Sequence, residues 1–220
     1  MPLTKGRRSI LEKTKASLSS RVAAVLAACL FLGCAKTDKG PFFLHPDTGL
    51  INASKAYAVD NEKIVFNGSS VRLSASLIRD APHDMPQTIK RLHEKGNIII
   101  SMEIENNSER KVLFDPTHVS LIYDKGVSID RPLDYTDIFE QIVNKREDAE
   151  FEAEEELRGI KSDFYYMPLT IGPGQREQRL LIFHSLPQSP EDAELTIREL
   201  YIGRQSIDIA FPFIVKGQLP

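Results

Sequence analysis

The chain has 220 residues, 41% of them hydrophobic, and a formal net charge of −3 at pH 7. Its two cysteines are Cys29 and Cys34, and it has no tryptophan. The body after Cys34 therefore excludes a disulfide framework, a thiolate metal site and a cysteine nucleophile. The acidic balance argues against a nucleic acid as partner.

The N-terminal segment combines a basic stretch with a short apolar run. Residues 1–21 hold six basic residues against one acid, and residues 22–32 are apolar throughout. This run is too short to span a bilayer, which takes about 20 residues. It fits the hydrophobic region of a secretory signal peptide, which usually has about 7–15 residues.

The apolar run ends in the string FLGC, residues 31–34. In this setting the string resembles the lipobox of bacterial lipoproteins. The resemblance implies that residues 1–33 are a signal peptide, that cleavage follows Gly33, and that Cys34 carries a diacylglycerol lipid. Ala35 follows in place of an aspartate, and this implies an outer-membrane anchor with the body facing the periplasm.

Two alternatives for the segment stay open. One is an uncleaved N-terminal anchor. The other concerns the export route, since the pair Arg7-Arg8 resembles a twin-arginine signal.

Six of the 28 basic residues and one of the 31 acidic residues lie in 1–33, so residues 34–220 carry a net charge of −8.

After the anchor we expect a tether and N-terminal extension over residues 34–62, followed by strands. Apolar and polar residues alternate most clearly at 97–105, which puts Ile98, Ile100, Met102 and Ile104 on one face. A tight turn with glycine at positive φ is expected at 124–126. The strands expected in this half are 63–66, 71–78, 97–105, 112–114, 119–123 and 127–129.

The alternation breaks at about 133–161, where we expect a helical insertion. Ile138, Phe139, Ile142 and Val143 recur at helical spacing. Asp134 or Thr136 would cap the first turn, and the second half is strongly acidic. Strands are expected to resume at 164–171, 178–184, 194–201 and 205–215.

These elements predict a mainly β domain over residues 63–220, an antiparallel β-sandwich with one helical insertion. The strings ENNS at 105–108, IGPGQ at 171–175 and IDIAFPF at 207–213 follow one another in this order. The pattern resembles immunoglobulin-like β-sandwich domains of small bacterial lipoproteins and secreted proteins, many of which have no assigned function.

One alternative function is a periplasmic copper carrier. His83, Met85 and His93 are ligands that suit a soft metal ion, and Met102 is a further candidate. Met102, however, lies on the apolar face of its expected strand, where core filling explains it. The main interpretation therefore includes no metal and no cofactor.

Partner contacts are expected in the insertion and just after it. Outward tyrosines can anchor a partner, which makes Tyr165 and Tyr166 candidates, and Glu152 and Glu155 would add acidic contacts. The alternatives are that the aromatic run packs under the insertion and that the acids form a solvated helix face.

No catalytic motif stands out. The five histidines are scattered, and the sequence contains no nucleophile elbow, zincin or Walker pattern. We therefore predict a non-catalytic, lipid-anchored, periplasm-facing lipoprotein that binds or helps assemble an envelope protein partner. An unrecognised hydrolase remains a further alternative.

Overall fold

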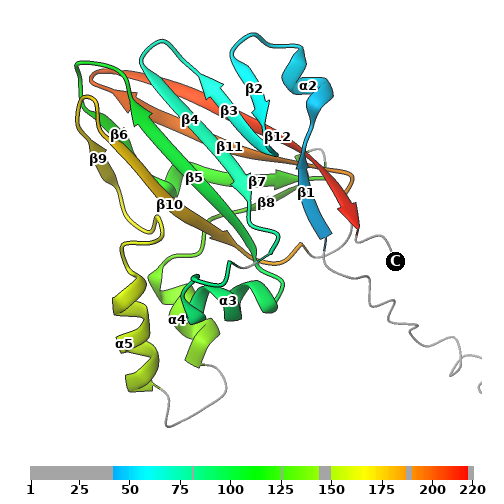
Figure 1. Cartoon of the computed structure of the whole chain (residues 1–220), viewed down its shortest axis with the longest axis vertical. Coiled ribbons are helices and arrows are strands. Elements are labelled where there is room, and N and C mark those ends of the chain that lie inside the picture. The colour runs from blue at the N-terminus through cyan, green and yellow to red at the C-terminus, as the bar shows by residue number, and fades with distance from the viewer. Residues whose placement is uncertain (1–41, 81, 125, 144–149, 187–189, 218–220) are drawn as a thin grey trace, which may run out of the picture. The chain divides into compact units, whose positions relative to one another are not determined.

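Alternating apolar residues build a sandwich of two antiparallel sheets, shown in Figure 1. The computed structural model describes residues 42–80, 82–124, 126–143, 150–186 and 190–217. They belong to one compact unit that runs from Gly40 to Pro220. The expected signal peptide and Cys34 lie outside the described residues.

The five-stranded sheet has the order β10-β5-β4-β3-β2, and every neighbouring pair is antiparallel. Its strands are β2 (Tyr57–Asp60), β3 (Lys63–Asn67), β4 (Val71–Leu77), β5 (Ile98–Asn106) and β10 (Arg176–Phe183).

The seven-stranded sheet is centred on its last two strands in the chain. The strand β11 pairs with β12 on one side, and with β6 and β7 on the other. The strands are β1 (Phe42–Pro46), β6 (Val112–Phe114), β7 (Val119–Tyr123), β8 (Ser128–Asp130), β9 (Leu169–Ile171), β11 (Asp192–Ile202) and β12 (Gln205–Gly217).

The strand order confirms the predicted sandwich. The run β4-β5-β10 corresponds to strands A, B and E of an immunoglobulin-type sandwich, and β12-β11-β7-β8 corresponds to G, F, C and C′. As predicted, Ile98, Ile100, Met102 and Ile104 are buried between the sheets. The insertion follows β8 and is followed by β9 of the same sheet and then by β10 of the five-stranded sheet.

The sandwich begins earlier than residue 63, which corrects the predicted boundary. The strand β1 pairs with β12, and β2 pairs with β3. Leu44 of β1 lies in the core. Between the two strands the short helix α2 (Thr48–Asn52) begins at Asp47, whose Oδ1 accepts from the backbone N–H of Gly49 at 2.9 Å.

Where the structure describes it, the predicted insertion is helical, with the two helices α4 (Tyr135–Val143) and α5 (Glu150–Ile160). Asp134 caps α4, since its Oδ1 accepts from the Asp137 N–H at 2.9 Å. Figure 1 shows both helices at one end of the sandwich together with α3 (Gln87–Glu94), which the sequence analysis missed. A 3-10 turn, η1 (Pro116–His118), precedes β7.

The three helices share a second hydrophobic core with the outer face of the five-stranded sheet. On β5 and β10 the side chains that face away from the sandwich here are Ile99 and Ile182, and both are buried. We call the three helices and this core the helical layer. The helices contribute Ile89 and Leu92 from α3, Ile138 from α4, and Leu157 and Ile160 from α5, and Leu133 and Phe164 lie outside the helices.

The quoted strings ENNS and IGPGQ meet around one buried amide. The Nδ2 of Asn106 donates to the carbonyls of Arg110 at 2.7 Å and Ile171 at 3.0 Å. Its Oδ1 accepts from the N–H of Ser108 at 3.0 Å. The backbone of Asn106 also bonds to Gly174 and Gln175. Asn106 therefore links the end of β5, in the five-stranded sheet, to β9 in the seven-stranded sheet, which is a structural role.

Candidate functional site

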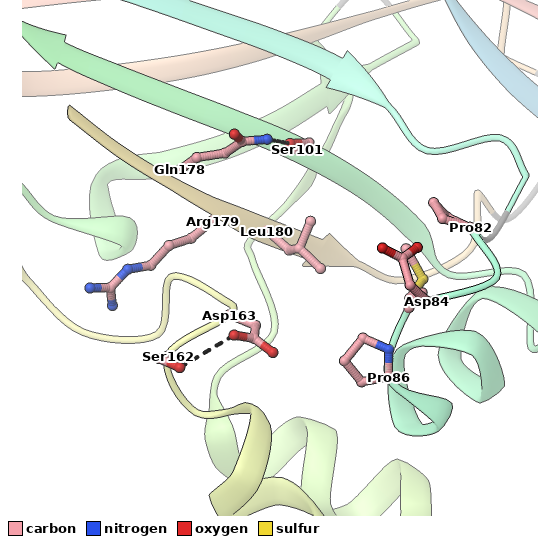
Figure 2. A pocket seen from close by; sticks show the side chains of 10 residues that line it. Pro82, Asp84, Pro86, Ser101, Ser162, Asp163, Gln178, Arg179 and Leu180 are labelled. Atoms are coloured by element: carbon pink, nitrogen blue, oxygen red, sulfur yellow. Dashed lines mark hydrogen bonds between the residues drawn. The ribbon is translucent and has the colours of Figure 1, made fainter.

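A groove of about 340 Å³ opens on the outer face of the five-stranded sheet, beside the helical layer (Figure 2). Four parts of the chain form it: the strand β5, the strand β10, the segment before α3, and the segment after α5. The lining residues are Pro82, Asp84, Met85, Pro86, Ser101, Ser162, Asp163, Gln178, Arg179 and Leu180.

Polar and apolar side chains alternate along the sheet part of the groove. Ser101 lies between the inward-facing Ile100 and Met102, so it faces outward. The Nε2 of Gln178 on β10 donates to Ser101 Oγ at 3.0 Å, as Figure 2 shows. Leu180, two residues further, adds an apolar surface. A ligand here meets both hydrogen-bonding groups and an apolar contact.

The segment before α3 forms one wall. The N–H of Met85 donates to the carbonyl of Pro82 at 3.1 Å, which folds the segment into a turn. Lys90 of α3 donates to the carbonyl of His83 at 2.7 Å. Met85 itself packs against the helical layer. These contacts hold the exposed Asp84 at the rim.

The segment after α5 forms another wall. The N–H of Leu180 donates to the carbonyl of Asp163, and the N–H of Tyr165 donates to the carbonyl of Leu180, both at 2.8 Å. Ser162 Oγ donates to Asp163 Oδ1 at 3.3 Å. In Figure 2 the Arg179 guanidinium extends away from both Asp84 and Asp163. The two carboxylates therefore favour a positively charged group in the groove.

Beyond the groove, the charged side chains on the same sheet face form ion pairs with one another. Glu103 is buried there and pairs with Arg176 and, at 4.0 Å, with Arg72. Arg72 also lies 3.7 Å from Glu105. These charges are matched within the chain, whereas the polar side chains of Ser101, Gln178, Asp84 and Asp163 line the open groove.

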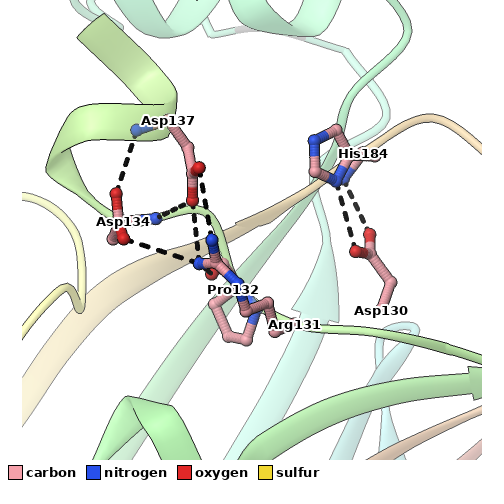
Figure 3. A network of polar contacts seen from close by, with 6 residues as sticks. All are labelled: Asp130, Arg131, Pro132, Asp134, Asp137 and His184. Atoms are coloured by element: carbon pink, nitrogen blue, oxygen red, sulfur yellow. Dashed lines mark hydrogen bonds and ion pairs between the residues drawn. The ribbon is translucent and has the colours of Figure 1, made fainter. Parts of the chain in front are cut away.

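A polar network next to the helical layer joins β8, α4 and β10, as shown in Figure 3. The Arg131 guanidinium lies 2.8 Å from Asp137 Oδ2. Burial raises the pKa of Asp137, but the hydrogen bonds from the Asp134 N–H and from Arg131 outweigh it, and the net pKa is lowered. The hydrogen bond to Asp137 raises the pKa of Arg131. The network fixes the start of α4.

The same figure contains a histidine–carboxylate pair. His184 Nδ1 lies 3.2 Å from Asp130 Oδ1, and the His184 N–H donates to Asp130 Oδ2 at 3.0 Å. Such a pair can orient an imidazole as a base. Here it also links the end of β8 to the end of β10, so that one contact bridges the two sheets. The hydrolase hypothesis stays untested.

The structure corrects one predicted partner contact. Tyr165 is 1% exposed, so it cannot contact a partner. Its ring packs against Phe114 with centroids 4.8 Å apart. Burial raises the pKa of its hydroxyl, which donates to the carbonyl of Glu177 at 3.3 Å. Tyr165 therefore packs in the core between the two sheets, and not under the insertion.

Tyr166 is half-buried beside the helical layer. Its ring lies 5.2 Å from Phe164 and 6.3 Å from Tyr135, centroid to centroid. The Lys161 ammonium lies 5.3 Å from the Tyr166 centroid. This side chain thus packs against the insertion and leaves one part accessible.

The acidic part of the insertion lies on α5. Glu155 is exposed there, whereas the Glu152 side chain lies outside the described residues. Neighbouring acids make ion pairs: Glu154 with Arg158 at 3.0 Å, and Glu156 with Arg91 at 3.2 Å. The second pair joins α5 to α3. The contact roles proposed for Glu152 and Glu155 remain predictions.

The residues proposed as copper ligands lie in different surroundings. His83 is exposed, His93 lies on α3, and Met85 packs against the helical layer. Met102 is buried in the sandwich, as core filling predicted. Within the described residues, no group of three or more His, Cys, Asp or Glu side chains is placed to hold a metal ion.

Sequence analysis missed the groove because its residues come from four separate segments with no shared motif. A partial signal was available: Ser101 and Gln178 are polar within strongly apolar strands. These two residues indicate neither the helix α3 nor the wall that Ser162 and Asp163 form.

Comparisons with known proteins were made for the sequence and for the fold. No family model and no curated protein matches the chain. Two solved structures resemble it. The yjhA protein from Bacillus subtilis is 14% identical, with a TM-score of 0.39, over 66% of this chain and 93% of its own. A functionally unknown protein from Listeria monocytogenes is 12% identical, with a TM-score of 0.37, and the match covers 80% of this chain and 89% of that protein.

Among the residues that the structure describes, none of the helices is long and apolar enough to cross a membrane.

Proposed function

We propose that this chain is a lipid-anchored binding lipoprotein of the bacterial envelope, tethered through Cys34 and facing the periplasm. It acts by binding an envelope protein, as an accessory or assembly subunit, and not by catalysis. The observation that carries the binding role is the groove beside the helical layer. The lipobox resemblance of residues 31–34 supports the anchor.

The groove suits an extended segment of a partner better than a small enclosed ligand. It is open, and its prolines and Leu180 offer apolar contact. Ser101 and Gln178 offer hydrogen bonds, and the carboxylates of Asp84 and Asp163 favour a basic side chain. The net charge of −8 on residues 34–220 works in the same direction by attracting a basic surface.

The anchor and the groove are tested separately. Metabolic labelling with a clickable fatty acid should mark the wild-type chain and not Cys34→Ser, since the thiol is the acceptor. Equal labelling of both chains would overturn the anchor and leave the groove unaffected.

For the groove, crosslinking and pulldown from intact cells would compare Asp84→Lys and Asp163→Lys with the control Glu109→Lys, an exposed acid in the turn after β5. Charge reversal at the groove should reduce recovery of the partner by about tenfold, because like charges then meet. The control should recover the partner as the wild type does. Equal recovery from all variants would overturn the groove as the binding site.

A further inference from the structure

One arginine side chain joins the two sheets at the first strand. Arg79 follows β4, at the end of a strand of the five-stranded sheet. Its Nη1 donates to Glu62 Oε1 at 2.6 Å, and its Nη2 donates to His45 Nδ1 at 2.7 Å. Glu62 lies in the turn between β2 and β3, and His45 lies on β1 of the seven-stranded sheet. We call this chain of three side chains the β1 latch, since it fastens β1 to the other sheet.

The strand β1 is an edge strand. Among the described strands it pairs with β12 alone, through residues 42–46. Its side chain Leu44 is buried in the core between the sheets. His45 is next in the strand, so it points to the opposite side, where it is partly buried. Edge and terminal elements open more readily than central ones, and the β1 latch therefore acts where the sandwich opens most easily.

The turn that carries Glu62 has an unusual backbone. Asn61 and Glu62 have φ angles of 47° and 65°. A two-residue turn between antiparallel strands needs positive φ at both positions, and glycine is the usual second residue. Glutamate rarely adopts this conformation. Here it supplies the carboxylate that holds Arg79, which gives the glutamate a structural role at a position that favours glycine.

The contact between Arg79 and His45 requires a neutral histidine. An arginine side chain only donates hydrogen bonds, so His45 Nδ1 accepts and the ring proton is on Nε2. A second proton would bind at Nδ1, because that is the nitrogen with the free lone pair. It would remove the acceptor and place a donor and a positive charge against the guanidinium. Protonation of His45 therefore breaks this part of the β1 latch.

The surroundings of His45 set the direction of the pH effect. Burial lowers the pKa of His45, the charges of Arg79 and of Lys216 on β12 lower it further, and Glu62 opposes them. Because the folded pKa lies below the unfolded value of about 6.5, the contribution of the neutral ring is complete above that pH. It is lost as the pH falls through the folded value. Acid therefore weakens the attachment of β1.

We propose that the β1 latch is a pH-sensitive device, which holds β1 on the sandwich at neutral pH and loosens it in acid. Loosening uncovers the edge of β12 on the side where β1 pairs, and the core surface under Leu44. A free sheet edge beside an apolar surface accepts a strand of another protein. None of the three latch residues lines the groove, so the device goes beyond the proposed function and does not depend on it.

Hydrogen exchange of the full chain measures the opening of β1. Mass spectrometry would give protection factors for the amides of β1, and of β5 as an internal reference, at about pH 7.5 and about pH 5, on either side of the unfolded pKa of histidine. After correction for the intrinsic effect of pH on exchange, β1 should lose about fivefold in protection in acid, the size of one lost hydrogen bond. The protection of β5 should stay the same, because β5 remains paired when β1 opens.

The variant His45→Asn separates protonation of this ring from other effects of acid. Asparagine keeps an acceptor for Arg79 and does not titrate, so β1 should be equally protected at both pH values. His83→Asn is the matched control, because it removes an exposed histidine. It should keep the loss that the wild type shows. Equal protection of wild-type β1 at both pH values, the same loss in His45→Asn, or removal of the loss by His83→Asn would overturn the proposal.

Nuclear magnetic resonance of the wild-type chain gives a second measurement, which does not depend on the folding of a variant. The ring of His45 should titrate with a pKa below its ordinary value, and its nitrogen chemical shifts at neutral pH should identify the tautomer with the proton on Nε2. A raised pKa, or a proton on Nδ1, would overturn the β1 latch.

Discussion

The outer faces of the two sheets differ in how their apolar residues are covered. On the five-stranded sheet, Ile182 is covered by the helical layer and is 1% exposed. On the seven-stranded sheet, Ile129 also faces outward, yet it is 66% exposed. The first isoleucine is explained by packing within the chain. The second has no such explanation among the described residues, which directs attention to a partner.

The largest expected effect tests this contrast with one substitution on each face. Ile182→Ala should lower the free energy of unfolding by about 2–5 kcal/mol, because it leaves a cavity under the helices. Ile129→Ala should change it by less than about 0.5 kcal/mol, because its side chain is in water. Urea unfolding of both variants measures the difference. Similar losses for both would mean that the two faces are equally covered.

A second prediction concerns the buried amide that joins both sheets. Asn106→Ala should cost about 2–4 kcal/mol, since the carbonyls of Arg110 and Ile171 lose their donor and stay in place. The neighbouring Asn107→Ala is the control, because Asn107 is exposed. Thermal unfolding compares them. A stable Asn106→Ala variant would show that closure of the sandwich does not depend on this amide.

A third prediction concerns pH and the network at the start of α4. The pKa of Asp137 is lowered in the folded chain, so its contribution is complete above the unfolded value of about 3.9 and disappears as the pH falls through the folded value. Asp137→Asn should therefore cost about 1 kcal/mol at pH 7 and progressively less below about pH 4.

Melting temperatures of wild type and variant across this pH range measure the effect, with Glu140→Gln as a control on the exposed side of α4. If the cost of Asp137→Asn were constant from neutral to acid pH, the ion pair with Arg131 would not be its cause.

The smallest expected effect is at Val127, between β7 and β8. The substitution Val127→Thr should leave the free energy of unfolding within about 0.5 kcal/mol of wild type, because Val127 is 84% exposed. Binding of the hydrophobic dye ANS to the native chain should fall at the same time. A clear loss of stability would mean that Val127 packs within the chain.

The sequence predicted those strands and helices whose apolar residues recur with a clear period. The alternation at Ile98, Ile100, Met102 and Ile104 located β5 and its inward face, because a buried strand face leaves a period of two. The spacing of apolar residues and Asp134 located the insertion in the same way. The domain boundary was placed too late, since β2 is mostly exposed and lacks a buried face.

Other features depend on contacts between distant segments. The helix α3 escaped prediction because it is short, has no side-chain cap, and shows only Ile89 and Leu92 on its buried apolar face. Tyr165 could not be distinguished from Tyr166 by sequence, since which of two adjacent aromatics enters the core depends on how 163–165 pairs with Leu180. To predict the groove, one would need the position of α3 and the pairing of 163–165 with Leu180 at the same time.

The most direct test of the proposed binding role places a photo-crosslinking amino acid at Gln178 in the groove, and at Glu109 as a control, in intact cells that make the lipidated chain. The account predicts one crosslinked envelope protein from position 178, absent from position 109 and reduced when Cys34→Ser removes the anchor. The same crosslinks from both positions, or none from position 178, would contradict it.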